Sequence, residues 1–120
     1  MKTCVNTPDL CSPQHDTRQV VIDFVDSSGV PFDVSSAPEI TFTISRTVKS
    51  AALITKKKSD GSLVLTNNTQ GRIDLSSVET GGLPLSRNYY ECRVATSGGE
   101  FVTVLSGNFY IQDTLIGDAP

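Results

Sequence analysis

The sequence predicts an all-β protein, folded as an antiparallel β-sandwich of two packed layers. The most informative segment runs from Leu85 to Asp113 and reads as two long strands joined by a tight turn at Ser97-Gly98-Gly99. Alternation along the first strand gives the side chains expected to face a core, which are Tyr90, Cys92 and Val94. The side chains expected on its other face are Tyr89, Glu91, Arg93 and Ala95. A half-buried hairpin needs one face for a core and one for water, so this segment indicates the fold class.

The earlier part of the chain repeats this alternation, with turn residues roughly every 8–12 positions. The chain has 120 residues, of which 38% are hydrophobic, including five Phe and three Tyr but no Trp. That length and composition suit one domain with one core. We therefore expect three segments: an extended N-terminal arm over residues 1–16, an immunoglobulin-like β-sandwich over residues 17–116 and a flexible tail over residues 117–120.

The arm is expected because residues 1–16 support no regular element. Pro8 and Pro13 interrupt any periodicity, and the segment has no apolar face to bury. An arm of this kind becomes ordered only by lying on its own domain or on a neighbour.

The middle of the chain reads as a series of short strands. The expected strands are Arg18–Val25, the edge piece Val30–Val34, Glu39–Val48, Ala51–Lys57, Leu63–Thr66 and Arg72–Leu75. Along Arg18–Val25 the side chains expected to face the core are Val20, Ile22 and Phe24. Along Glu39–Val48 those expected to face the core are Ile40, Phe42 and Ile44, and those expected to face outward are Thr41, Thr43 and Ser45.

Two irregular segments complete the pattern. Ser76–Thr80 predicts a helical turn, which Gly81-Gly82 ends. The last strand is interrupted at Ser106–Asn108, whose glycine indicates a bulge that lets Phe109 and Ile111 face the core again. Seven to nine short strands are expected of an immunoglobulin-like sandwich. An eight-stranded barrel is the alternative, but the unequal strand lengths and the helical connection fit a Greek-key sandwich better.

Six short segments, in their order along residues 18–113, resemble a known family. They are Val30–Val34 (VPFDV), Ile40–Ile44 (ITFTI), Gly71–Leu75 (GRIDL), Leu83–Leu85 (LPL), Tyr89–Val94 (YYECRV) and Gly107–Ile111 (GNFYI). The family is the N-terminal domain of phage baseplate upper proteins, whose members are immunoglobulin-like domains of virion proteins. The resemblance implies a virion structural protein, made in the host cytoplasm, that binds other virion proteins as a homo-oligomer or symmetric assembly. It implies no catalytic residues and no cofactor.

Where the chain ends bears on the role that we expect within this family. Because it stops soon after the closing segment, we expect a small tail, neck or baseplate adaptor, a capsid-decoration protein or a fibre-anchoring protein.

The N-terminal residues lack the apolar middle of a signal peptide. No apolar run approaches the roughly 20 residues that span a bilayer. The net charge of −3 disfavours nucleic acid and anionic membranes as partners.

Cys4, Cys11 and His15 form the pattern C-x6-C-x3-H in the arm. Zinc needs four ligands and a closer cysteine pair, so we expect no metal here. A Cys4–Cys11 bridge and a reduced pair both fit the sequence. His15 is the only histidine, and an extended arm does not hold a base beside a nucleophile. We keep these three residues as candidate partner contacts, and expect Cys92 to be a small buried hydrophobe.

Two sets of charged residues have structural interpretations. Lys56-Lys57-Lys58 borders a turn, where charge protects a strand edge from pairing with other chains; contact with an acidic partner surface is the alternative. Four aspartates raise the question of calcium but lack the order of a calcium-binding loop, and they are Asp23, Asp26, Asp33 and Asp74. We expect turn-forming or solvent-facing roles for them.

Tyr89 and Tyr110 fall on the outward face of the terminal hairpin and are candidate partner contacts. Exposed tyrosines fill pockets on partner proteins, or stack on sugars. The sequence therefore predicts a phage virion structural protein that acts by protein–protein docking. The alternative is a carbohydrate-binding or host-surface adhesion module. An enzyme has no support, because no set of acid, base and nucleophile can be assembled.

Overall fold

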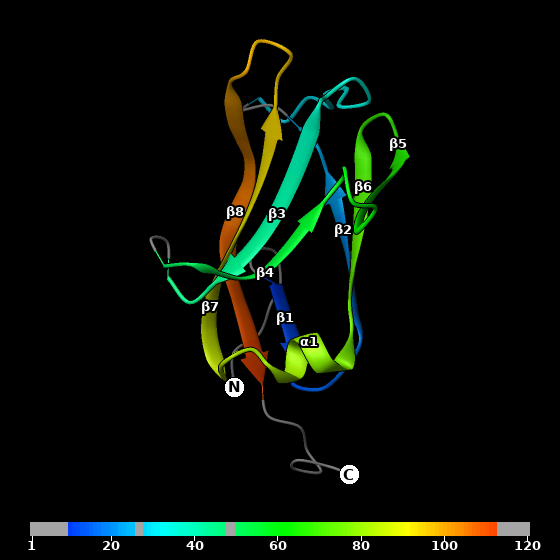
Figure 1. Cartoon of the computed structure of the whole chain (residues 1–120). Helices are drawn as coiled ribbons and strands as arrows, with labels where there is room; N and C mark the ends of the chain where they lie inside the picture. The colour runs from blue at the N-terminus through cyan, green and yellow to red at the C-terminus, as the bar shows by residue number, and fades with distance from the viewer. Residues whose placement is uncertain (1–9, 26–27, 48–49, 113–120) are drawn as a thin grey trace.

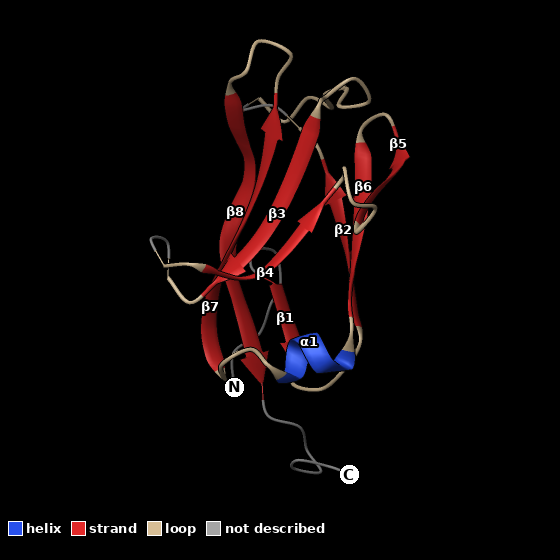
Figure 2. Cartoon of the chain, viewed as in Figure 1, coloured by secondary structure: helices blue, strands red, loops and turns tan. Residues whose placement is uncertain are grey.

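The computed structural model describes residues 10–25, 28–47 and 50–112. The elements within these ranges are β1 (Leu10–Pro13), β2 (Arg18–Asp23), β3 (Glu39–Ser45), β4 (Ala52–Lys57), β5 (Leu63–Asn67), β6 (Gln70–Leu75), α1 (Ser77–Gly81), β7 (Ser86–Ala95) and β8 (Phe101–Gln112). A five-stranded sheet has the order β1-β8-β7-β3-β4, and a three-stranded sheet has the order β2-β6-β5 (Figure 1). The two sheets form a sandwich with α1 at one end (Figure 2). The predicted immunoglobulin-like β-sandwich is confirmed.

The strand order follows the immunoglobulin plan. The three-stranded sheet corresponds to strands B, E and D of that fold, and β8-β7-β3-β4 corresponds to G, F, C and C′. These neighbours pair antiparallel, whereas β1 lies parallel to β8 at the edge of the larger sheet. The connection from β6 to β7 crosses from one sheet to the other and carries α1.

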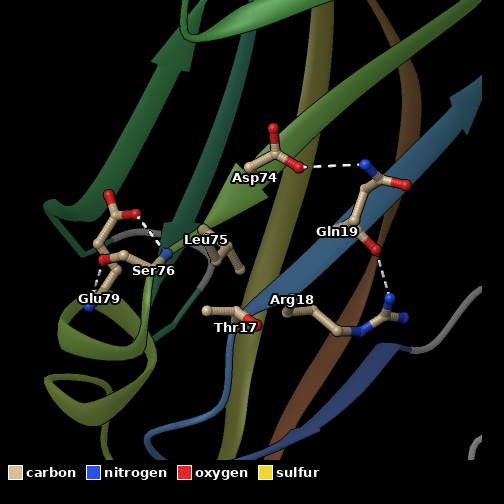
Figure 3. Close-up of a pocket in the computed structure, with 7 residues that line it drawn as sticks. All are labelled: Thr17, Arg18, Gln19, Asp74, Leu75, Ser76 and Glu79. Carbon is tan, nitrogen blue, oxygen red and sulfur yellow. Dashed lines mark hydrogen bonds between the residues drawn. The ribbon is translucent and has the colours of Figure 1, made fainter.

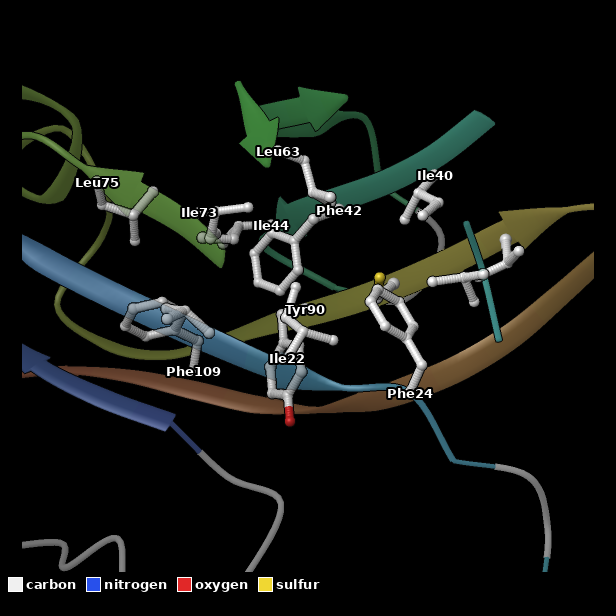
Figure 4. Close-up of a cluster of buried hydrophobic side chains, with 14 of the residues drawn as sticks. Ile22, Phe24, Ile40, Phe42, Ile44, Leu63, Ile73, Leu75, Tyr90 and Phe109 are labelled. Carbon is white, nitrogen blue, oxygen red and sulfur yellow. The ribbon is translucent and has the colours of Figure 1, made fainter. Parts of the chain in front are cut away.

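The space between the sheets holds the side chains that alternation predicted to face inward (Figure 4). Those buried are Val20, Ile22, Phe24, Ile40, Phe42, Ile44, Tyr90, Cys92, Val94, Phe109 and Ile111. Phe42 and Tyr90 stack with their ring centroids 5.7 Å apart. Burying one such large side chain contributes about 1.5–3 kcal/mol, so this cluster holds the two layers together.

Cys92 is the small buried residue that the sequence predicted. It is a free thiol with no exposed surface. Burial, with a smaller effect from the Glu91 carboxylate, raises the pKa of this thiol to about 12. Tyr90 precedes Cys92 by two residues, which is the spacing of the corner tyrosine and the second disulfide cysteine in antibody domains. Here the cysteine serves as a core side chain without that disulfide.

The predicted arm is wrong for Leu10–Pro13, which forms β1. This segment pairs with β8 from Leu10 opposite Phe109 to Pro13 opposite Gln112. Ser12 is buried, and Leu10 packs against the core. The prolines indicated an irregular arm. Proline has no backbone N–H, however, so Pro13 is tolerated in a strand at the edge of a sheet. Residues 1–9 of the expected arm lie outside the described residues, as does the expected tail over residues 117–120.

Two smaller expectations also need correction. Val30–Val34 forms no strand and contributes one isolated bridge, between Val25 and Pro31. β8 is continuous through Ser106–Asn108. Its pairing register with β7 shifts between Cys92 and Arg93 instead, where Val104 is the extra residue of β8. Ser45 lies opposite Tyr89 and so faces outward as expected, although it is buried there, and its hydroxyl donates to the Thr47 carbonyl at 2.7 Å.

The three lysines at the end of the edge strand β4 differ: two make internal contacts and one is exposed. Lys56 lies opposite Phe42, on the inner face, and its ammonium contacts the Glu79 carboxylate at 2.7 Å. Lys58 turns back to donate to the Ala37 carbonyl at 2.9 Å. Of the three lysines, only Lys57 is exposed. An inward-pointing charge on an edge strand is one means of discouraging pairing with other chains, and here it also connects β4 to α1.

The predicted helical turn is present as α1, and a capping box fixes its start. The Ser76 hydroxyl accepts from the Glu79 amide at 3.1 Å, and the Glu79 carboxylate accepts from the Ser76 amide at 2.9 Å. Burial would raise the pKa of Glu79, but the hydrogen bonds from Lys56 and Ser76 outweigh it and lower that pKa. Glu79 therefore stays ionised and links both sheets through α1.

Candidate interaction face on the five-stranded sheet

The two predicted tyrosines lie on one face of the molecule. Tyr89 on β7 is opposite Asn108 on β8, and Tyr110 on β8 is opposite Arg87 on β7. Both side chains are half-buried and project from the outer face of the five-stranded sheet, while Tyr90 points into the core. Residues in this diagonal relation on an antiparallel pair are close enough for long side chains to share a surface. We call this surface the outer face.

Each tyrosine lines its own shallow hollow on the outer face. The hollow beside Tyr89 has a volume of about 190 Å³ and is lined also by Thr43, Ser45, Ser50, Ala52 and Glu91. The hollow beside Tyr110 has a volume of about 470 Å³ and is lined also by Arg46, Thr47, Leu85, Ser86 and Arg87. We call the second the arginine hollow.

The three arginines of the outer face differ in their surroundings. Arg93 pairs with Glu91 at 3.3 Å, and its guanidinium lies 5.6 Å from the ring centroid of Phe101. Arg46 and Arg87 are both exposed, and neither forms an ion pair with a carboxylate among residues 10–25, 28–47 and 50–112. Two guanidiniums at one hollow, with no carboxylate partner in these ranges, can bind an external anion.

Sequence reasoning missed Arg46 and Arg87, and also Phe101, which is 64% exposed. Arg87 alternates with Tyr89, so its face could have been assigned from the same pattern. Arg46 comes from the β3–β4 connection and reaches the hollow only because β3 pairs with β7, with Ser45 opposite Tyr89. No local signal in the sequence indicates that neighbour.

The candidate residues from the predicted arm are separated by the structure. Cys11 lies on β1 opposite Tyr110, at the rim of the outer face, and it is disulfide-bonded. His15 is exposed in the turn after β1, with a φ of 67°, and its ring lies close against Gly81 of α1. It lines neither hollow. Cys4 lies outside the described residues.

A third hollow, of about 330 Å³, lies where β2, β6 and α1 meet (Figure 3). Its two carboxylates already have internal partners. Asp74 accepts from the Gln19 amide at 3.3 Å, and Glu79 accepts from Lys56 at 2.7 Å. The Arg18 guanidinium donates to the Gln19 carbonyl and, at 3.2 Å, to the Cys11 carbonyl. This hollow is therefore a junction of structural contacts.

Metal ligands do not gather within the described part of the chain. No three His, Cys, Asp or Glu side chains there are placed to hold an ion. Of the four aspartates considered for calcium, Asp23 accepts from Gln70 at 2.8 Å and Asp33 accepts from the Ser35 hydroxyl at 2.6 Å. Asp26 lies outside the described residues. Within the same ranges, no helix is long and apolar enough to cross a membrane.

No protein-family model and no curated protein matches the chain. Among solved structures, the chain is similar to the immunoglobulin-like domain of mouse leukocyte-associated immunoglobulin-like receptor 1, a strand-swapped dimer. The identity is 9% and the TM-score 0.53, over 92% of this chain and 95% of that chain. The extracellular domain of the same receptor, also a strand-swapped dimer, matches with 10% identity and a TM-score of 0.50 over the same shares. At such identities the likeness shows the immunoglobulin-like fold alone.

Proposed function

We propose that this chain is a docking domain that binds other proteins through the outer face, and that its setting is a phage particle. The observation that carries the docking role is the arginine hollow, where Tyr110 lies beside Arg46 and Arg87, two arginines with no ion-pair partner among the described residues. Aromatic and arginine side chains are enriched where binding energy concentrates in protein interfaces. The phage setting rests on the sequence resemblance of six segments to baseplate domains.

The proposal assigns the sandwich a supporting role and no reaction. The core between the sheets fixes the pairing of β3, β7 and β8, and that pairing places the side chains of the outer face. Sites built on strands are held more precisely than sites on loops. Many copies arranged symmetrically on one particle would add avidity, so each contact could be individually weak.

Photo-crosslinking at matched positions tests this proposal. A benzoylphenylalanine at Tyr89 probes the outer face, and one at Val21, which is 53% exposed on the three-stranded sheet, serves as control. In particles purified from cells that make both the phage and the variant, we expect the probe at Tyr89 to crosslink to one structural protein. The probe at Val21 should give no such product.

Two results would contradict the proposal in different parts. Equal crosslinking from both positions would remove the assignment of the outer face. Absence of the protein from purified particles would remove the phage setting.

Recognition of a carbohydrate on a host surface is the second candidate, and the two outward tyrosines favour it. A glycan array with the monomeric domain distinguishes the two. Saturable binding of one glycan, lost in Tyr89→Ala or Tyr110→Ala and kept in Val21→Ala, would replace protein docking with glycan recognition.

A further inference from the structure

We propose that the arginine hollow binds the carboxylate of an acidic side chain on a partner protein, where that residue is followed by an apolar one. The inference rests on the proposed docking function and names what one part of the outer face recognises.

The first argument is charge. The guanidiniums of Arg46 and Arg87 border the same hollow and have no ion-pair partner among the described residues. Arg93, on the same strand and face as Arg87, is already paired with Glu91. A guanidinium presents a planar set of donors that matches the two oxygens of a carboxylate. The hollow is thus the part of the outer face that can accept a new carboxylate without displacing an internal one.

The second argument is that hydrogen bonds hold the backbone beside Arg46. The buried Ser45 hydroxyl donates to the Thr47 carbonyl at 2.7 Å. The Thr47 amide donates to the Ser50 hydroxyl at 2.9 Å. Arg46 therefore projects from a backbone held on both sides of it, which lowers the ordering cost of binding.

The opposite wall of the hollow, Leu85–Arg87, is also fixed. Asn88 is fully buried, and its side-chain amide donates to the Pro84 carbonyl at 3.0 Å, which closes a loop around this wall. Within it, Ser86 has a φ of 81°, a conformation that residues other than glycine rarely adopt. Backbone outliers of this kind persist where the surrounding structure enforces them, often at binding sites. Asn88 thus holds the backbone that carries Arg87.

The third argument concerns the neighbour of the carboxylate. Leu85 is 47% exposed at the hollow, and the Tyr110 ring adds a second apolar surface. An apolar side chain next to the acidic one can cover both. The chain carries a net charge of −3, which repels a polyanion more than it repels one carboxylate. The hollow therefore suits an acidic peptide segment better than a nucleic acid.

A nuclear magnetic resonance titration of the whole chain tests this assignment. The probe is N-acetyl-Glu-Leu-amide, and its neutral match is N-acetyl-Gln-Leu-amide. We expect the Glu peptide to shift the backbone amides of Arg46, Thr47, Arg87 and Tyr110 in a saturable way. The Gln peptide should bind more weakly, by up to about fivefold for each charge pair that it cannot form, since an exposed charge pair contributes up to about 1 kcal/mol.

Arginine variants localise the effect. Arg46→Gln and Arg87→Gln should each weaken binding of the Glu peptide about fivefold, and the double variant should show no saturable shift. Arg93→Gln is the matched control, because that guanidinium is already engaged, and its affinity should equal that of the wild type. Unchanged affinity in the double variant, or an equal loss in Arg93→Gln, would overturn the proposal.

Two further probes define the ligand. Equal affinity for N-acetyl-Glu-Gly-amide would overturn the requirement for an apolar neighbour. Inorganic phosphate that binds as tightly at the same amides would replace the peptide carboxylate with a general anion.

These results are separable from the crosslinking experiment. Failure of peptide binding with selective crosslinking from Tyr89 would remove the arginine hollow and keep the docking face. Peptide binding without crosslinking would keep the hollow and remove the docking function.

Discussion

The outer faces of the two sheets differ in how they treat charged and polar side chains. On the three-stranded sheet these groups bind one another. Asp74 pairs with Arg72 at 3.5 Å and accepts from Gln19 at 3.3 Å, while Asp23 accepts from Gln70 at 2.8 Å. Its apolar members, Val21 and Val64, are single exposed side chains and require no special explanation.

On the five-stranded sheet the pairing is incomplete. Arg93 has Glu91, but Arg46 and Arg87 have no carboxylate within the described residues, and the surface beside them is hollowed. A face whose charges are paired internally gains little by meeting a partner, because each new contact must replace an existing one. The difference indicates which side of an otherwise similar sandwich is suited to binding.

The largest expected effect removes the support that both faces share. Phe42→Ala deletes a fully buried ring that stacks on Tyr90, so we expect a loss of about 3–5 kcal/mol in the free energy of unfolding. Urea unfolding measures it. Thr41→Ala, on the same strand but the other face, is the control and should change stability by less than about 0.5 kcal/mol. Comparable losses in the two variants would mean that the sheet faces are assigned wrongly.

The sequence predicted this shared core well because the signal is local. Alternation of period two assigns Val20, Ile22 and Phe24 to one face without knowing their partners. β1 could not be found in this way. It is a four-residue strand with a proline, and its pairing with β8 is parallel and far away in the sequence. The irregularity at Val104 depends likewise on how β7 and β8 align, which the glycine at position 107 does not reveal.

The candidate site was predictable only in part, for the same reason. Alternation placed Tyr89 and Tyr110 outward, and the structure confirms that they share a face. Arg46 and Arg87 line the same hollow because β3 lies beside β7 and because the Ser45 hydroxyl bonds to the Thr47 carbonyl. Both conditions belong to the tertiary structure, which the local sequence pattern does not reveal. The sequence therefore predicts the face but not the hollow on it.

The second largest effect is expected from a deletion that removes a strand from one of the two sheets, the five-stranded one. Removing residues 2–14 takes away β1, with the buried Ser12 and the packed Leu10, so we expect a loss of about 2–4 kcal/mol in unfolding free energy. Amide resonances of β8 should shift, as should that of Arg18, whose guanidinium bonds to the Cys11 carbonyl, while those of β5 and β6 stay in place. Removing residues 2–9 together with Cys11→Ser, the control, keeps β1 and should be less destabilising. Equal losses would contradict the role of β1.

The contact that joins the two sheets has an intermediate expected effect. Lys56→Met removes the ammonium from Glu79 but keeps the aliphatic stem, and we expect a loss of about 1–2 kcal/mol at pH 7. Lys57→Met, its exposed neighbour, is the control and should be nearly neutral. A neutral Lys56→Met would mean that the ion pair does not couple β4 to α1.

The same contact has a defined pH dependence. The folded-state pKa of Glu79 lies below its ordinary value of 4.5, so its stabilisation is fully present above that value. It is lost as the pH falls from 4.5 through the lower, folded-state pKa. Lys56→Met should flatten this acid limb of the stability curve, measured by urea unfolding at several pH values. An unchanged limb would assign the acid dependence to other carboxylates.

The smallest expected effect is the most direct test of the contrast between the faces. Arg72→Gln breaks a pair that is mostly exposed, so we expect at most about 1 kcal/mol of destabilisation. Arg87→Gln removes a guanidinium with no ion-pair partner among the described residues, so stability should change by less than about 0.5 kcal/mol, while carboxylate binding falls. If Arg87→Gln destabilised the fold as much as Arg72→Gln, then Arg87 would be a structural residue. An arginine that costs nothing in stability when removed is more readily explained by what it binds.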